Sequence, residues 1–264
     1  MSRISKTFRQ LKKEGRKALI PFITAGDPSL KETEKLIFTL EKAGVDIIEL
    51  GVPFSDPMAD GAVIQAASER ALKKKVTLSD ILNLVARVRK KTQIPILLMG
   101  YYNPIFVMGE ETFAQKAAQS GVDALLIVDC PPEESHSLRK ALRIHSIDLV
   151  YLLAPTSDEK RIKLATQNAS GFIYYVSLTG VTGAKLQVTD EIKAQVDKIR
   201  AVKKIPVCVG FGISTPNQAA QIAPLADGVV IGSVLVNLIF HKTHGSQTNH
   251  TKVHQFISKF RHLF

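Results

Sequence analysis

The stretch AGVDIIELG, residues 43–51, contains the pattern that decides the fold: a small residue and a glycine followed by a run of apolar residues. The pattern returns as SGVDALLIVD (120–129), ASGFIYYVS (169–177) and ADGVVIGS (226–233). Runs that are nearly continuous in Ile, Val and Leu are typical of strands buried on both faces of a parallel sheet. This weak repeat indicates a chain built from recurring strand–helix units.

Outward from these stretches, the chain contains eight short apolar runs, at residues 19–24, 47–50, 96–100, 124–128, 149–153, 172–176, 207–210 and 228–231. Segments with a helical period lie between them, at 30–43, 78–91, 110–120, 133–145, 158–168, 190–202 and 215–223. The expected N-caps of these helices are Ser29, Ser79, Ser157, Thr189, and Ser214 or Thr215. Eight such units without a long linker favour a closed (β/α)8 (TIM) barrel of the α/β class over an open doubly wound sheet.

The whole chain, residues 1–264, is expected to form one such barrel domain, because a (β/α)8 barrel needs roughly 250 residues. Residues 1–16 predict an extra N-terminal helix. Residues 241–264 are polar, contain five of the seven histidines and are expected to end in a closing helix. The histidines are irregularly spaced, which favours a solvated tail over a metal site.

Composition and charge argue against a nucleic-acid-binding, a membrane-spanning or a secreted protein. The 35 basic and 24 acidic side chains give a formal net charge of +11, but many lysines lie at expected helix ends, as in 73–75 and 203–204. Cations there complement the helix dipole, so we expect a solvated surface and no nucleic-acid partner. No apolar stretch reaches the ~20 residues of a membrane span, and residues 1–16 do not resemble a signal peptide. Two isolated cysteines, Cys130 and Cys208, suggest a reducing compartment. A cytoplasmic protein is expected.

The residues after each apolar run are the candidates for chemistry, because the active site of this fold lies at the C-terminal ends of the strands. Glu49 ends an otherwise apolar run, where a carboxylate must be paired, neutralised or used in a reaction. The alternative is a structural glutamate bonded to backbone or lysine. Asp60 lies in the following loop, but Asp60-Gly61 is also an ordinary turn signal, so spacing alone leaves both interpretations open.

Glycines follow each of the last three apolar runs, at Gly180 and Gly183, at Gly210 and Gly212, and at Gly232 beside Ser233. Glycine lets backbone N–H groups approach an anion, and a helix N-terminus favours negative charge. Phosphate sites in this fold lie after strands 7 and 8. One pair alone is a plain turn, but the three together predict a phosphorylated ligand.

Six segments resemble, in order, the signature segments of the tryptophan synthase alpha chain family: FITAGDPS (22–29), ELGVPFSDPMADG (49–61), LLMGYYNPI (97–105), LAPTSDE (153–159), GVTGA (180–184) and VGFGIST (209–215). The resemblance covers roughly residues 16–236. It implies a lyase that splits indole-3-glycerol phosphate into indole and glyceraldehyde 3-phosphate, with no cofactor or metal of its own. It also implies an α2β2 complex with a pyridoxal-phosphate-dependent beta chain that consumes the indole.

The implied reaction is a retro-aldol cleavage, which needs proton transfer and stabilisation of positive charge on the indole nitrogen. By resemblance Glu49 is the acid–base, Asp60 is the partner of the ring N–H, Tyr174 orients Asp60, and Thr182 closes over the site. The resemblance places Phe22, Ile64, Met99 and Phe211 around the ring. It assigns the phosphate to Gly183, Gly212, Gly232 and Ser233.

Three positions depart from the family pattern: Ala62 and Val128, where proline is common, and Leu178, where several members have arginine. They concern loop closure rather than the proposed catalytic groups. A metal-dependent epimerase would need histidines at strand ends, and a Schiff-base aldolase would need a lysine in a strand, which the apolar runs lack. A non-catalytic regulatory subunit stays open as an alternative, because loop closure gates activity.

Overall fold

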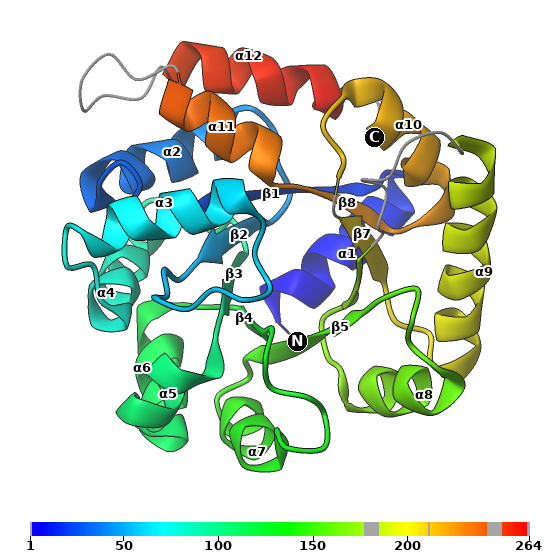
Figure 1. Cartoon of the computed structure of the whole chain (residues 1–264), viewed down its shortest axis with the longest axis horizontal. Coiled ribbons are helices and arrows are strands. Elements are labelled where there is room, and N and C mark those ends of the chain that lie inside the picture. The colour runs from blue at the N-terminus through cyan, green and yellow to red at the C-terminus, as the bar shows by residue number, and fades with distance from the viewer. Residues whose placement is uncertain (1, 177–184, 211, 242–249, 263–264) are drawn as a thin grey trace.

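Eight parallel strands form a closed barrel in chain order, with β8 paired to β1 (Figure 1). The computed structural model describes residues 2–176, 185–210, 212–241 and 250–262. The strands are β1 (Ala18–Thr24), β2 (Ile48–Gly51), β3 (Ile96–Gly100), β4 (Ala124–Ile127), β5 (Asp148–Leu153), β6 (Ile173–Val176), β7 (Val207–Gly210) and β8 (Gly228–Ile231). The predicted (β/α)8 barrel is confirmed, and every strand end lies within about one residue of its apolar run.

Helices surround this barrel (Figure 1). They are α1 (Arg3–Lys13), α2 (Leu30–Lys42), α3 (Ala62–Leu72), α4 (Leu78–Arg89), α5 (Tyr102–Met108), α6 (Glu110–Ser120), α7 (His136–Ile144), α8 (Glu159–Asn168), α9 (Lys185–Val202), α10 (Pro216–Ile222), the 3-10 turn η1 (Ala223–Leu225), α11 (Ser233–His241) and α12 (His250–Arg261). The sequence did not predict α3 and α5. Neither has a side chain that caps its first turn, so the usual start signal is missing.

The helix starts correct part of the capping prediction. Ser29 and Thr215 cap α2 and α10 as expected. Three expected caps are wrong, namely Ser79, Ser157 and Thr189. The side chains of Thr77 and Asp158 instead accept the first-turn N–H bonds of α4 and α8, and α9 already begins at Lys185. Neighbouring polar residues compete for each cap, and the sequence does not show which one the chain turns toward the helix.

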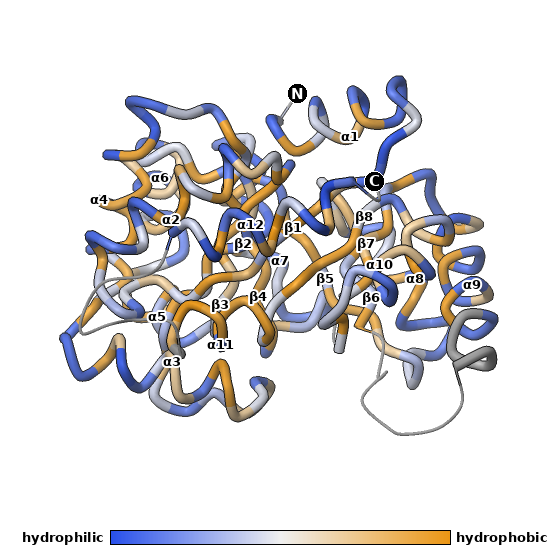
Figure 2. The backbone as a smooth tube through the Cα atoms, turned by 90° about the horizontal axis from the view of Figure 1, so that it is seen from above, coloured by the Kyte–Doolittle hydropathy of each residue, from blue (hydrophilic) through white to orange (hydrophobic). Residues whose placement is uncertain are grey.

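Apolar side chains pack in two layers. An outer layer fills the space between the strands and the surrounding helices. An inner layer fills the barrel itself, and α1 contributes Ile4, Phe8 and Leu11 to it. Figure 2 shows α1 lying across one end of the barrel. Because α1 covers the end where the strands begin, the opposite end, where the strands finish, is left for a site.

The C-terminal segment ends in a helix, as the sequence suggested, but this helix is packed on the barrel rather than solvated. Helix α12 buries Val253, Ile257 and Phe260. The ring of His250 contacts the Thr39 hydroxyl at 2.8 Å and the Glu32 carboxylate at 3.1 Å, both on α2. Residues 242–249 lie outside the described residues. Within the described part, no helix is long and apolar enough to cross a membrane, and no group of three or more potential metal-ligating side chains occurs.

Candidate active site

A pocket of about 160 Å³ lies where the strands end. It brings together nine of the residues singled out from the sequence: Phe22, Glu49, Asp60, Ile64, Met99, Tyr174, Gly212, Gly232 and Ser233. Thr182, Gly183 and Phe211 lie outside the described residues. The pocket is also lined by five residues that sequence reasoning missed, namely Gly61, Ile213, Ser214, Val230 and Val234. Three of these five, Gly61, Ile213 and Val234, adjoin a residue that was singled out, so adjacency was the available signal for them.

Glu49 provides an acidic group at the base of this pocket. It lies on β2 between Phe22 of β1 and Leu97 of β3, and only 1% of its surface is exposed. Its Oε1 atom has no hydrogen-bond partner among the described residues. Burial, and secondly the charge of Asp60, raise the pKa of Glu49 to about 8. The side chain is therefore protonated at neutral pH and has a free oxygen facing the site.

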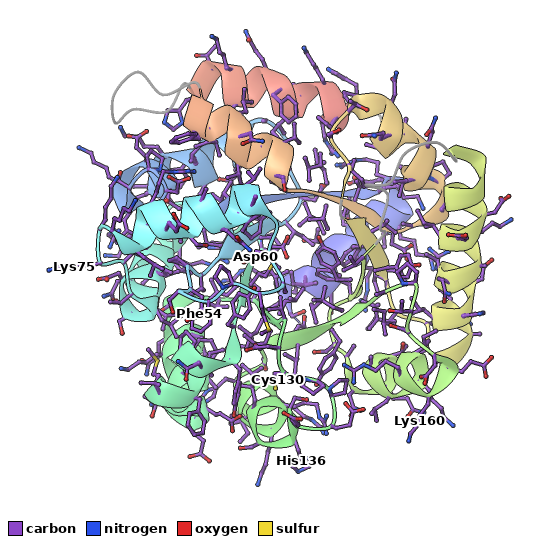
Figure 3. All side chains as sticks on the ribbon, in the orientation of Figure 1. Phe54, Asp60, Lys75, Cys130, His136 and Lys160 are labelled. Atoms are coloured by element: carbon purple, nitrogen blue, oxygen red, sulfur yellow. The ribbon has the colours of Figure 1, made fainter. Side chains whose placement is uncertain are left out.

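Asp60 belongs to the loop between β2 and α3, and Figure 3 shows it near the centre of the ring of strands. Burial raises the pKa of Asp60, while a hydrogen bond from Tyr101 lowers it. Tyr101 also accepts a bond from the Ala59 N–H at 3.0 Å. Gln65 donates to the Asp60 carbonyl at 2.8 Å. Sequence reasoning missed Tyr101 and Gln65, although Tyr101 follows the Gly that ends β3.

Tyr174 lines the pocket from β6 and is buried. Burial and then the charge of Glu49 raise the pKa of Tyr174 well above its usual value, so its hydroxyl stays neutral. A Cβ atom on Gly210 would lie 2.2 Å from that hydroxyl, so glycine is required there. The tyrosine that bonds Asp60 is Tyr101, and an orienting role for Tyr174 stays a prediction.

Apolar groups form the wall of the pocket. The ring of Phe22 lies over Gly51, where a Cβ atom would come within 2.5 Å of it. Ile64 projects from the first turn of α3, and Met99 from the end of β3. A flat aromatic ligand fits such a wall, since its face needs no hydrogen bonds.

The other end of the pocket offers backbone donors. Gly212 has a φ of +77°, a conformation that suits glycine, and Ser233 begins α11 directly after Gly232. No lysine or arginine lines the described part of the pocket. An anion at this end would be bound by N–H groups and the helix N-terminus rather than by a counter-charge.

Two of the three departures from the family pattern can be placed. Ala62 is the first residue of α3, which forms without the proline. Val128 follows β4 and adjoins the small hollow beside Asp60. Leu178 lies outside the described residues.

Comparison with known proteins agrees with this geometry. A model of the family "Tryptophan synthase alpha chain" matches residues 8–264. The tryptophan synthase alpha chain of Geobacter sp. strain M21 is 57% identical over 247 residues, covering 94% of this chain and 92% of the relative. The relative from Citrifermentans bemidjiense is 58% identical with the same coverage.

Solved structures show the same likeness. The tryptophan synthase alpha subunit of Legionella pneumophila superposes with a TM-score of 0.92 at 42% identity, over 100% of this chain and 98% of that one. A chain of tryptophan synthase from M. tuberculosis in its aminoacrylate-bound form gives a TM-score of 0.88 at 31% identity, over 98% of both chains. The chain therefore belongs to the tryptophan synthase alpha chain family, the lyases of tryptophan biosynthesis that cleave indole-3-glycerol phosphate.

Proposed function

We propose that Glu49 and Asp60 carry out the cleavage of indole-3-glycerol phosphate in this pocket, with Glu49 as acid–base and Asp60 as the partner of the indole nitrogen. The observation that carries this proposal is a pair of carboxyl groups that line one pocket in different environments. Burial raises the pKa of both groups, but Glu49 is fully buried with a pKa of about 8 and an unpartnered oxygen, whereas Asp60 accepts a hydrogen bond from Tyr101 that lowers its pKa. Two such environments divide the roles of acid and anion.

The first step is a proton transfer. Protonated Glu49 gives its proton to C3 of the indole ring, which places positive charge on the ring nitrogen. The Asp60 carboxylate accepts a hydrogen bond from the ring N–H and stabilises that charge. Because the wall around the ring is apolar, this attraction is stronger than in water.

The second step breaks the carbon–carbon bond. Glu49, now a carboxylate, takes the proton from the hydroxyl on the carbon attached to C3. The oxygen electrons form the aldehyde carbonyl, and the electrons of the broken bond return to the ring. The products are indole and glyceraldehyde 3-phosphate, and Glu49 is protonated again for the next cycle. The backbone donors at Gly212, Gly232 and Ser233 hold the phosphate throughout.

A direct test is indole release by Glu49→Gln, which keeps the shape of the side chain but cannot transfer the proton. We expect a loss of at least about a hundredfold in kcat, with binding of glyceraldehyde 3-phosphate retained. Glu34→Gln, on the outer side of α2, is the control and should keep full activity. Retained turnover within tenfold in Glu49→Gln would contradict the assignment. A wild-type chain that releases no indole, alone or with a partner, would support the regulatory-subunit alternative.

We also propose that the chain binds a beta chain in an α2β2 complex through the loop 53–57 and α5. Three apolar side chains project into solvent on α5 and directly after this loop: Phe106 is 65%, Val107 77% and Met58 86% exposed. Phe54 stacks on Tyr101 at 4.9 Å, which connects this surface to the ring that bonds Asp60. An exposed apolar cluster at an active-site rim marks an interaction surface.

Val107→Asp tests this surface, with Ile144→Asp on α7 as the matched control, because Ile144 is 71% exposed. Titration of each variant with a cognate beta chain should show association weakened only for Val107→Asp. A substrate analogue should increase the affinity for the beta chain by the same factor by which the beta chain increases the affinity for the analogue. Equal effects of both variants, or no association of the wild type, would exclude this interface.

A further inference from the structure

The arginines of the chain separate into two groups. All eleven lie among the described residues, and eight form ion pairs with carboxylates. The three for which the described residues supply no carboxylate partner are Arg9, Arg139 and Arg143. All three line hollows on the two flanks of α1, at the end of the barrel opposite the active site.

The larger cluster of cations lies in a hollow of about 740 Å³ between α7, the start of β5, and the ends of α8 and α9. Its basic lining residues are His136, Arg139, Lys140, Arg143 and Lys203. Figure 3 shows His136 on α7 at the rim of the molecule. The second hollow, which holds Arg9 and Lys12, shares Ser5 with the first, so the two continue into each other along α1.

One guanidinium group of the first hollow has a buried N–H group without an acceptor in the described part of the chain. The Nη1 atom of Arg139 is buried and has no hydrogen-bond partner among the described residues. Its Nη2 atom contacts only the Nδ1 atom of His136, at 3.3 Å. Arg143 lies one helical turn further along α7, so both guanidinium groups share a face. A buried N–H group without an acceptor is costly, which indicates that an acceptor comes from outside the chain.

Asp148 is the single carboxylate among the described residues that line this hollow, and it already accepts hydrogen bonds. Asp148 accepts a hydrogen bond from the Ser2 hydroxyl at 2.5 Å, and a second from Ser170. Lys203 donates to the Ala169 carbonyl at 2.8 Å but keeps its charge facing the hollow. Two arginines, two lysines and one aspartate leave a net charge of +3 without His136. The missing acceptor is therefore an anion.

We propose that this hollow binds a small, multiply charged phosphate anion, such as inorganic tripolyphosphate or the phosphate chain of a nucleotide. One guanidinium group can bind two oxygens of a phosphate at once. Arg139 and Arg143 lie one helical turn apart, with Lys203 on the other wall, so the three cations suit an anion with more than one phosphate. The volume lies within the range of small-ligand sites. Among the described residues, no Phe, Tyr or Trp lines the hollow, so these residues offer nucleic-acid bases no stacking surface.

Calorimetric titration of the full chain with sodium tripolyphosphate at fixed ionic strength tests the proposal. We expect saturable binding at one site, weakened about tenfold or more in Arg139→Gln/Arg143→Gln. The control is Arg87→Gln/Arg161→Gln, which removes the same charge from exposed ion pairs and should bind within about threefold of the wild type. Indole release should be unchanged in both, because the hollow and the active site lie at opposite ends of the barrel.

Three results would overturn the proposal: no saturable binding, equal weakening in both double variants, or tighter Arg139-dependent binding of a single-stranded oligonucleotide than of tripolyphosphate. Adenosine triphosphate and free tripolyphosphate, titrated separately, distinguish the two sources of the phosphate chain. If the double variant does not fold, Arg143→Gln alone decides, because Arg143 is exposed and its replacement removes no buried contact.

Discussion

Glu49 is buried by the fold, although the reaction needs its carboxyl group to lose and regain a proton. The pKa of Glu49 is about 8 in the folded chain and near 4.5 when unfolded. Between these values the folded state binds one proton more than the unfolded state. The free energy of unfolding therefore falls as pH rises through this window, by about 1.4 kcal/mol per pH unit.

This linkage predicts that Glu49→Gln, which does not titrate, becomes more stable relative to the wild type as pH increases from 5.5 to 7.5. Urea unfolding of both chains at the two pH values measures the difference. The gain should be lost below pH 4.5, where the wild-type group is protonated in both states. A difference that does not change with pH would show that burial leaves this pKa near its ordinary value.

Tyr101 is the second residue for which we expect a specific effect on activity, through its hydrogen bond to Asp60. Its hydroxyl bonds Asp60 and accepts from Ala59, while its ring stacks on Phe54. Tyr101→Phe keeps the stacking and removes the hydroxyl, so the pKa of Asp60 should rise and kcat/KM for indole release should fall about tenfold. Tyr102→Phe is the matched control, because its hydroxyl bonds Glu110 away from the pocket. Equal activity of the two variants would separate Tyr101 from the reaction.

Among the elements, α3 is joined to its neighbours by an ion pair with a buried carboxylate. Arg70 on α3 donates to both carboxylate oxygens of Asp27 at 2.8 and 2.6 Å, and its guanidinium lies 3.8 Å from the Phe240 ring of α11. Asp27 is only 4% exposed. The pair therefore joins the loop after β1, α3 and α11, three parts that border the active site.

We expect Arg70→Met to lower the free energy of unfolding by about 3 kcal/mol, because the carboxylate of Asp27 would stay buried without a partner. Arg87→Met, which breaks an exposed pair with Glu34, should cost less than about 1 kcal/mol. Denaturant titration of both variants gives the comparison. Similar losses would mean that solvent reaches Asp27 and replaces the guanidinium.

On the scale of the whole molecule, the inner core of the barrel is completed by a helix from outside the β/α repeat. Phe8 of α1 packs on Phe172 at 5.7 Å and is 7% exposed. Phe8→Ala should lower the free energy of unfolding by about 3–5 kcal/mol, with indole release kept under native conditions. Phe106→Ala, at an exposed ring, should leave stability nearly unchanged. Loss of activity without loss of stability in Phe8→Ala would contradict a purely structural role for α1.

The sequence by itself determined the barrel. A strand buried on both faces needs a continuous apolar run, and this requirement is local, so all eight strands were predicted to within about one residue. Glu49 was singled out for a related reason, because a carboxylate in such a run must be paired, neutralised or used in a reaction. The glycines after β7 and β8 and the segment 49–61 directed attention to the same end of the barrel.

Only the tertiary structure decided which groups meet. Tyr101 and Asp60 are 41 positions apart and bond because adjacent strands β2 and β3 bring their loops together. The raised pKa of Glu49 depends on how completely its neighbours exclude water, which no local pattern records. Arg9, Arg139 and Arg143 could be recognised as arginines without a carboxylate partner among the described residues only from the tertiary structure, which places the carboxylates. Strand formation depends on neighbours in the chain, whereas charge, burial and partnership depend on neighbours in space, and these are set only when the barrel closes.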